Sequence, residues 1–86
     1  MKSRIDKLKY KVATSVWVTN YYYKNNYYHR EKDLPAIIWQ DGTRAWYKNG
    51  KQHRDNGKPS EICSDGRMHW YENGNYIKDN SDEIKN

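Results

Sequence analysis

A unit of 24 residues is written twice in the middle of this chain. Residues 29–52 and 53–76 follow each other without a gap, and ten of the 24 aligned positions are identical. Unrelated segments of ordinary composition would share about one or two positions. Self-similarity at a fixed period is the sequence signature of a repeat architecture, so the chain is predicted to stack copies of one small supersecondary unit.

A weaker copy precedes these two. Subtracting the period places Tyr22-Tyr-Lys-Asn-Asn26 under Trp46-Tyr-Lys-Asn-Gly50, so residues 8–28 are interpreted as a degenerate repeat. Its first half lacks the proline and the Asp-Gly pair, as expected of a terminal copy that caps the array. Residues 77–86 are predicted to form a short edge strand at Ile77 and then a polar tail. The whole chain, residues 1–86, is therefore expected to be a single repeat domain of about three copies.

Turn signals divide each copy into short strands. Four dipeptides carry them: Asp41-Gly42, Asn49-Gly50, Asp65-Gly66 and Asn73-Gly74. Type I′ turns need positive φ at both central positions, which these residue types tolerate, so the dipeptides are predicted to close two-residue hairpins. In the first full copy the strands would span residues 35–40, 43–48 and 51–54. The predicted fold class is all-β, an elongated antiparallel meander or hairpin repeat sheet.

The loop length would also set the register of the strands. A two-residue loop at Asp41-Gly42 pairs Ile38 with Ala45 and Ile37 with Trp46. One face of the sheet would then carry Ile37, Trp39, Trp46, Glu61, Cys63, Met68 and Trp70, and the other Ala36, Ile38, Ala45, Tyr47, Ser60, Ile62, His69 and Tyr71. Neither face is cleanly polar, so the sheet is expected to curl or to cover one face with a partner.

Composition limits the classes of protein to which the chain can belong. With nine Tyr, four Trp and no Phe in 86 residues, most of its large apolar surface carries a polar tip, which suits a half-wet sheet or a binding face. The net charge of +5 comes from 16 basic and 11 acidic residues, which is less basic than a dedicated nucleic-acid-binding protein. The single cysteine, Cys63, excludes an intramolecular disulfide and a cysteine-based zinc finger, so we expect a cytoplasmic protein.

The N-terminus and the abundance of certain residue types add two expectations. The N-terminus is charged and has no apolar stretch behind it, so neither a signal peptide nor a transmembrane segment is expected. The abundance of Lys, Asn, Tyr and Ile is typical of AT-rich coding and suggests a phage or a low-GC bacterium. A phage-encoded chain would act in the cytoplasm of its host.

Three signatures recur in the two full copies: Trp-Tyr-x-Asn-Gly, His-Arg-x-x-x-x-Pro and Asp-Gly-x-x-x-Trp-Tyr. They resemble the variant MORN-type repeats of phage, giant-virus and bacterial proteins, including an antitoxin-like group, over residues 29–76 and in part over residues 20–28. The resemblance implies successive antiparallel hairpins in one twisted sheet that serves as a non-enzymatic scaffold for proteins or acidic lipids. The His-Arg-x-x-x-x-Pro element is an addition to that pattern, and the lipid role is not carried over.

His29-Arg30 and His53-Arg54 occupy the same position in the repeat. In one interpretation they form a row of cationic pairs, about 10–14 Å apart, that contacts phosphates or carboxylates. In the other, each histidine packs against its own hairpin and the arginine pairs with a neighbouring acid such as Asp55. We favour the second because side chains that recur with a repeat commonly serve the repeat.

Signatures of catalysis or metal binding are weak. His29, His53 and His69 share no tight spacing of the kind that a metal site needs. A ribonuclease-like pair of histidines with a lysine is formally possible, but no nucleophile, oxyanion device or phosphate loop accompanies it. Cys63 aligns with Trp39 and is interpreted as a packing residue. We therefore expect no enzyme, no metal and no cofactor.

Tyrosines crowd residues 21–28. A hairpin closed at Asn25-Asn26 would place Tyr23 opposite Tyr28. Three roles are open: cross-strand aromatic pairing that strengthens an end hairpin, a protein-binding hot spot, or a platform on which nucleic-acid bases stack.

The leading hypothesis is a non-enzymatic protein-binding module, in the manner of a small phage or bacterial inhibitor or antitoxin. A homodimer is also expected because so thin a sheet buries little area of its own. The alternative is a nucleic-acid-binding protein that uses Lys and Arg for phosphates and Tyr for stacking. The predicted binding residues are Tyr23, Tyr28, Arg30, Trp39, Trp46, Tyr47, Arg54, Trp70 and Tyr71.

Overall fold

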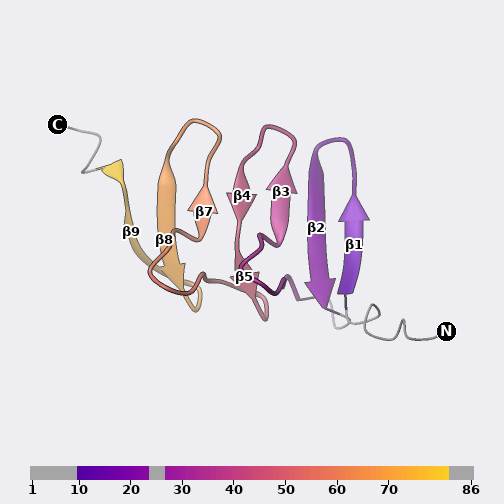
Figure 1. Ribbon diagram of the computed structural model, residues 1–86, viewed down its shortest axis with the longest axis horizontal. Helices are drawn as coiled ribbons and strands as arrows, with labels where there is room; N and C mark the ends of the chain where they lie inside the picture. The colour runs from indigo at the N-terminus through magenta and orange to yellow at the C-terminus, as the bar shows by residue number, and fades with distance from the viewer. Residues whose placement is uncertain (1–9, 24–26, 82–86) are drawn as a thin grey trace.

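Every regular element of the described chain is a β-strand (Figure 1). The computed structural model describes residues 10–23 and 27–81, and for residues 10, 11, 22 and 23 it describes the backbone alone. The strands are β1 (Tyr10–Thr14), β2 (Val18–Tyr23), β3 (Ile37–Trp39), β4 (Arg44–Ala45), β5 (Tyr47–Lys48), β6 (Lys51–Gln52), β7 (Glu61–Ile62), β8 (Met68–Glu72) and β9 (Asn75–Asp79). The predicted all-β class is confirmed. Within these ranges no helix is long and apolar enough to cross a membrane.

Some predictions lie outside the described residues. They are the hairpin closed at Asn25-Asn26, the side chain of Tyr23 and the tail that follows Ser81. They remain predictions.

Seven of the strands form one antiparallel sheet in the order β1-β2-β3-β4-β7-β8-β9, and β5 pairs with β6 in a separate ribbon. In Figure 1 the seven strands stand side by side along the long axis of a molecule that measures 56 × 27 × 17 Å. The predicted third strand of the first full copy is present as β6, but it pairs only with β5. The chain thus leaves the sheet after β4, turns through the ribbon and re-enters at β7.

Within the degenerate first repeat, residues 10–23 form the β1–β2 hairpin. Ser15 makes its turn: the Ser15 N–H donates to the Val18 carbonyl at 2.9 Å, and the Ser15 Oγ accepts from Trp17 N at 3.1 Å. A serine hydroxyl that binds the backbone two residues on is a common turn former. Subtracting the 24-residue period from the Asp-Gly loop of the next copy gives residues 16–18, so this turn falls at the equivalent position.

The two Asp-Gly loops differ from the prediction, because each contains three residues. Trp39 N donates to Thr43 O at 2.9 Å, and Gly42 N donates to Trp39 O at 2.9 Å. Gly42 is the loop residue with positive φ, 96°, which is the pattern of a type I turn followed by a left-handed glycine. Asp41 Oδ1 accepts from Thr43 N at 2.9 Å and holds the aspartate in this turn. The second copy repeats the backbone arrangement 24 residues later.

The longer loop shifts the strand register by one residue, so the predicted faces are wrong. Ala45 lies opposite Ile37, not Ile38. In the second copy Glu61 lies opposite His69. A shift of one residue moves a side chain to the other face of the sheet. Ile37 and Ala45 therefore share one face, and so do Glu61 and His69.

Asn49-Gly50 and Asn73-Gly74 are type I′ turns, as predicted. The asparagines have φ of 51°, and the two glycines have φ of 84° and 85°. In both turns two residues connect the paired strands, β5 with β6 and β8 with β9. Positive φ at both central positions matches the right-handed twist of the flanking strands.

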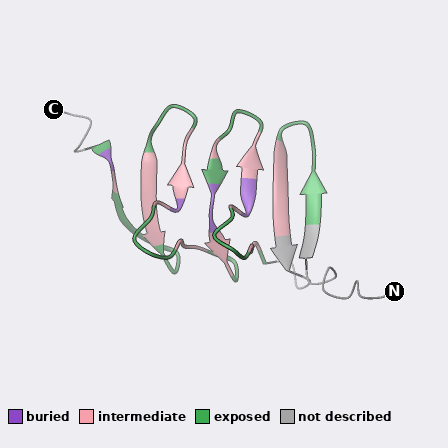
Figure 2. Cartoon of the chain, in the orientation of Figure 1, coloured by how far each residue is buried: buried purple, intermediate pink, exposed green. Residues whose placement is uncertain are grey.

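Burial is concentrated around β3 and β4 (Figure 2). The buried apolar cluster consists of Ala36, Ile37 and Ala45, with Val18, Tyr28, Trp39 and Tyr47 packed against it. The second full copy has Ser60, Glu61 and His69 at the three cluster positions. The first full copy therefore supplies the apolar core of the described sheet, and the second replaces it with polar groups.

The predicted edge strand at Ile77 is β9, which pairs with β8. Asn80 closes it: Asn80 Oδ1 accepts from Met68 N at 3.0 Å, and Asn80 Nδ2 donates to Gly66 O at 3.2 Å. Asn80 is itself buried. Its side chain pairs with backbone groups at the start of β8.

Candidate functional site

The two repeat histidines hold the turns of their own copies. His29 Nδ1 accepts from the Asn49 N–H at 2.9 Å, and His29 Nε2 lies 2.9 Å from Glu31 Oε2. His53 makes the equivalent contacts at 3.1 and 2.9 Å. Because Nδ1 accepts from a backbone N–H, the proton lies on Nε2, which donates to the carboxylate. Both ring nitrogens of each histidine are engaged, which supports a packing role.

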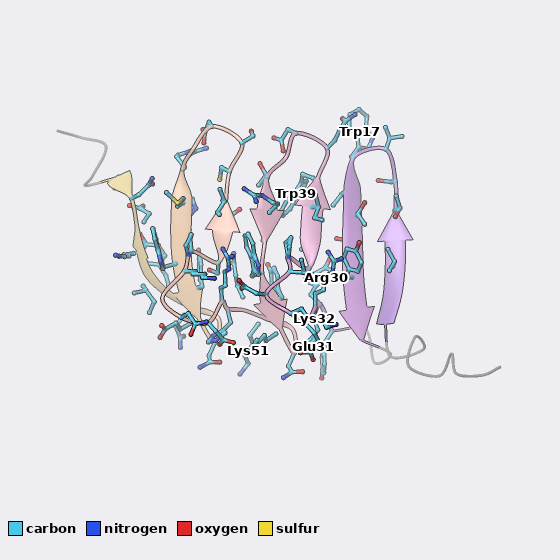
Figure 3. All side chains as sticks on the ribbon, in the orientation of Figure 1. Trp17, Arg30, Glu31, Lys32, Trp39 and Lys51 are labelled. Atoms are coloured by element: carbon cyan, nitrogen blue, oxygen red, sulfur yellow. The ribbon has the colours of Figure 1, made fainter. Side chains whose placement is uncertain are left out.

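The two repeat arginines hold the loop that follows them. Arg30 and Arg54 each donate from Nη1 to the carbonyl of the proline five residues on, at 3.2 Å. Each guanidinium group also stacks on an aromatic ring, 3.6 Å from the Tyr21 centroid for Arg30 and 3.8 Å from the Trp46 centroid for Arg54. Figure 3 shows Arg30 between β3 and the first hairpin. These contacts engage both side chains within the fold.

Asp33 joins the two full copies. Its carboxylate accepts from Arg54 Nε at 2.9 Å and from Lys58 Nζ at 3.0 Å. The hydrogen bond from Arg54 and then that from Lys58 lower the pKa of Asp33 from 3.8 to about 2. Asp55, the acid predicted to pair with the arginine, binds Lys48 instead. The hydrogen bond from Lys48 is the main cause of a lowered pKa at Asp55.

The predicted tryptophans hold the same loops. Trp46 is 5% exposed, and its indole N–H donates to Asp33 O at 2.9 Å. Trp70 is half-buried and donates in the same way to Gly57 O at 2.9 Å. Trp46 has little surface to offer a partner, whereas Trp39 is half-buried at the end of β3.

The predicted tyrosines pack in pairs. Tyr28 and Tyr47 are half-buried, with ring centroids 5.3 Å apart. Burial raises the pKa of Tyr47. Tyr71 packs edge-on against Tyr76, with centroids 5.5 Å apart. Such pairs stabilise neighbouring strands.

The most exposed large apolar side chains of the described chain lie at the β1–β2 turn. Val16 and Trp17 are each 68% exposed. Gln40 N donates to Trp17 O at 2.7 Å, which joins this turn to the Asp-Gly loop of the next hairpin. Figure 3 shows Trp17 at the end of the first hairpin, with Trp39 on the hairpin beside it.

A shallow depression of about 210 Å³ lies between these two loops. It is lined by Ser15, Val16, Trp17, Val18, Thr19, Ile38, Trp39 and Gln40, which we call the tip patch. None of its eight residues is charged, although 31% of the chain is. The tip patch is therefore an uncharged surface, and Val16 and Trp17 are its two strongly exposed large apolar side chains.

Of the predicted binding residues, only Trp39 belongs to the tip patch. Val16 and Trp17 were missed because no Asp-Gly pair marks the turn of the first copy. The period could have found them, since it places a loop at residues 16–18. Valine and tryptophan there serve no turn geometry, and their presence at an exposed loop is the informative feature.

Comparison of the chain with models of protein families, with curated proteins and with solved structures found no match. The MORN-type resemblance therefore stays a prediction. The function has to be argued from the geometry of the described residues.

Proposed function

We propose that this chain is a MORN-type repeat protein of a phage or bacterium that binds another protein in the cytoplasm and blocks it, without catalysis of its own. The tip patch carries the proposal. Exposed apolar clusters with polar surroundings mark sites of protein interaction. Tryptophan is also among the residue types that most often dominate binding energy.

In this proposal Trp17 and Val16 are the anchors, and Trp39 forms the wall of the depression beside them. The partner presents an apolar pocket to Trp17. The remaining predicted residues whose side chains the structure describes are half-buried or buried in the repeat, and they hold the hairpins in place. The hydrogen bond between Gln40 N and Trp17 O keeps the two loops together, so the anchors are presented on a preorganised surface.

The charges of the chain favour this proposal over nucleic-acid binding. Seven described cations already contact an acid, a carbonyl or an aromatic ring: Arg30, Arg44, Lys48, Arg54, Lys58, Arg67 and Lys78. Phosphate binding would have to compete with these contacts. The tip patch itself offers no cation to a phosphate backbone.

The test compares Trp17→Ser with Leu34→Ser, which alters an exposed apolar side chain outside the tip patch. Each variant and the unchanged chain are used to capture proteins at high salt from a nuclease-treated extract of a low-GC bacterium. A captured protein is then purified, and its affinity for the three chains is measured by calorimetry. We expect Trp17→Ser to weaken binding by about 30-fold, since a hot-spot residue contributes about 2 kcal/mol, and Leu34→Ser to leave it unchanged.

Two outcomes would overturn the proposal. One is equal binding by both variants. The other is capture of proteins only from an extract that has not been treated with nuclease, because such proteins would be held through nucleic acid. Light scattering of the chain alone tests for a homodimer that covers the tip patch, which Trp17→Ser would dissociate.

A further inference from the structure

Three metal-ligating side chains meet on one face of the sheet where β7 pairs with β8. Glu61 lies directly opposite His69. Cys63 stands two residues after Glu61, so all three side chains point to the same face. The carboxylate oxygen, the thiol sulfur and the imidazole nitrogen all lie within 4.8 Å of one another.

Within the described part of the chain, one nitrogen of the His69 ring lacks a hydrogen-bond partner. Its Nδ1 is buried and has no hydrogen-bond partner among the described residues. Glu61 Oε1 is 3.3 Å away but does not have the geometry of a hydrogen bond. A buried polar nitrogen without a partner in a native structure needs an explanation, and an ion is one of the recognised ones.

The preceding copy provides an internal comparison. At the positions of Glu61, Cys63 and His69 it has Ile37, Trp39 and Ala45. Those three residues belong to or pack against the apolar cluster, so the repeat fold needs no polar group there. A cross-strand ion pair would account for Glu61 and His69, but it would not account for the thiol beside them.

We propose that Glu61, Cys63 and His69 bind a divalent zinc-class cation, with water as the fourth ligand. Thiolate and imidazole donors favour such ions over magnesium or calcium. The thiolate and the carboxylate together neutralise the double charge of the ion. Coordination releases the thiol proton to solvent, because the thiolate is the ligand.

The observed geometry is close to what a zinc site needs. Zinc lies about 2.0–2.3 Å from nitrogen, oxygen and sulfur ligands, which puts ligand atoms about 3.3–3.8 Å apart in a tetrahedron. The three donors therefore need side-chain movements of about 1 Å to close on an ion. The face is half-buried at all three residues, which leaves room for a water ligand.

The test titrates the full chain with Co²⁺, whose thiolate complexes absorb in the near ultraviolet. We expect one equivalent per chain with a sulfur-to-metal charge-transfer band. Cys63→Ser should abolish the band and weaken binding at least tenfold. Zn²⁺ should displace the Co²⁺ and raise the melting temperature of the unchanged chain.

A matched control variant replaces the three donor residues with those at the equivalent positions of the preceding copy, as Glu61→Ile with Cys63→Trp and His69→Ala. This variant should fold without any dependence on Zn²⁺ and show no band. If it does not fold, Cys63→Ser decides the question on its own, because serine is close to cysteine in size. Binding by either variant that is as tight as binding by the unchanged chain, or half an equivalent of metal per chain, would overturn the proposal. The test involves no protein partner and is independent of the proposed function.

Discussion

His29 is buried, and the backbone N–H of Asn49 has its Nδ1 as acceptor. Replacing His29 with alanine leaves that N–H without its partner, which costs about 1–3 kcal/mol in a buried setting. We expect His29→Ala to lower the free energy of unfolding by this amount in urea denaturation. His53, whose side chain is 18% exposed, makes the same contacts with more access to water, so His53→Ala should cost less. If the histidines served only to bind phosphate, neither change would affect stability.

The carboxylate of Asp33 gives the fold a predictable dependence on pH. Its pKa is lowered from 3.8 to about 2 in the folded chain. A group of this kind stabilises the fold above its unfolded pKa, and the stabilisation is lost as the pH falls through the folded value. The difference in unfolding free energy between the unchanged chain and Asp33→Asn should therefore be full above about pH 4 and vanish near pH 2.

The size of that difference is limited by exposure. The Asp33 side chain is 41% exposed, so solvent screens its ion pairs and we expect about 1 kcal/mol at neutral pH. Asparagine keeps the backbone carbonyl that accepts from Trp46, which confines the change to the charge. Urea denaturation at several pH values measures it. A difference that stays constant between pH 7 and pH 2 would show that the pairs with Arg54 and Lys58 do not contribute.

At the scale of the element, the turn before β3 is built from unsuitable residues. Lys32 has φ of 64°, and its equivalent in the next copy, Asn56, has φ of 68°. The two positions thus share the left-handed conformation and differ only in the type of residue. The left-handed conformation costs an ordinary residue about 1 kcal/mol, and asparagine tolerates it. Lys32→Asn should therefore stabilise the chain by about 0.5–1 kcal/mol and raise its melting temperature by a few degrees. The reciprocal change, Asn56→Lys, should lower it by a similar amount, and a melting temperature unaffected by both changes would contradict the argument.

The turns also show how far local sequence reasoning reaches. Asn49-Gly50 was predictable because both residues accept positive φ and nothing nearby competes. Asp41-Gly42 was not, because the Asp41 side chain binds the backbone of Thr43 and selects a three-residue loop. The longer loop shifts the register by one residue, so every later side chain of the strand lies on the face opposite to the predicted one. Asn56-Gly57 is a readable turn signal that the prediction passed over.

The candidate sites were harder to predict than the strands for the same reason. With the predicted register, Glu61 and His69 fall on opposite faces, so their meeting with Cys63 was invisible. The tip patch was not predicted because the first copy lacks the Asp-Gly pair that marks the turn in the other copies. By contrast, the contacts that recur 24 residues apart explain why His, Arg, Pro, Trp and Gly were identical between copies. Positions that are identical between the copies hold residues with a structural role. The candidate metal ligands occupy positions at which the two copies differ.

At the scale of the whole molecule, the sheet is long and thin, so each hairpin contacts mainly its neighbours. In such arrays stability is close to a sum of local terms, and the ends can open without the centre. The buried apolar cluster lies on β3, β4 and the residue before β3. The centre of the sheet should therefore open less often than its C-terminal edge.

Asn80→Ala tests this expectation by hydrogen exchange. The change removes the acceptor of the Met68 N–H and the side-chain donor to Gly66 O. We expect faster exchange at Met68 and along β9, with exchange at the Ala36 and Trp39 amides unchanged, because those donate within the central hairpin. An equal increase at all of these amides would instead show that the sheet opens as one cooperative unit. In that case a partner or a metal ion bound at either end would stabilise the entire chain, whereas in the expected case each would order only its own hairpins.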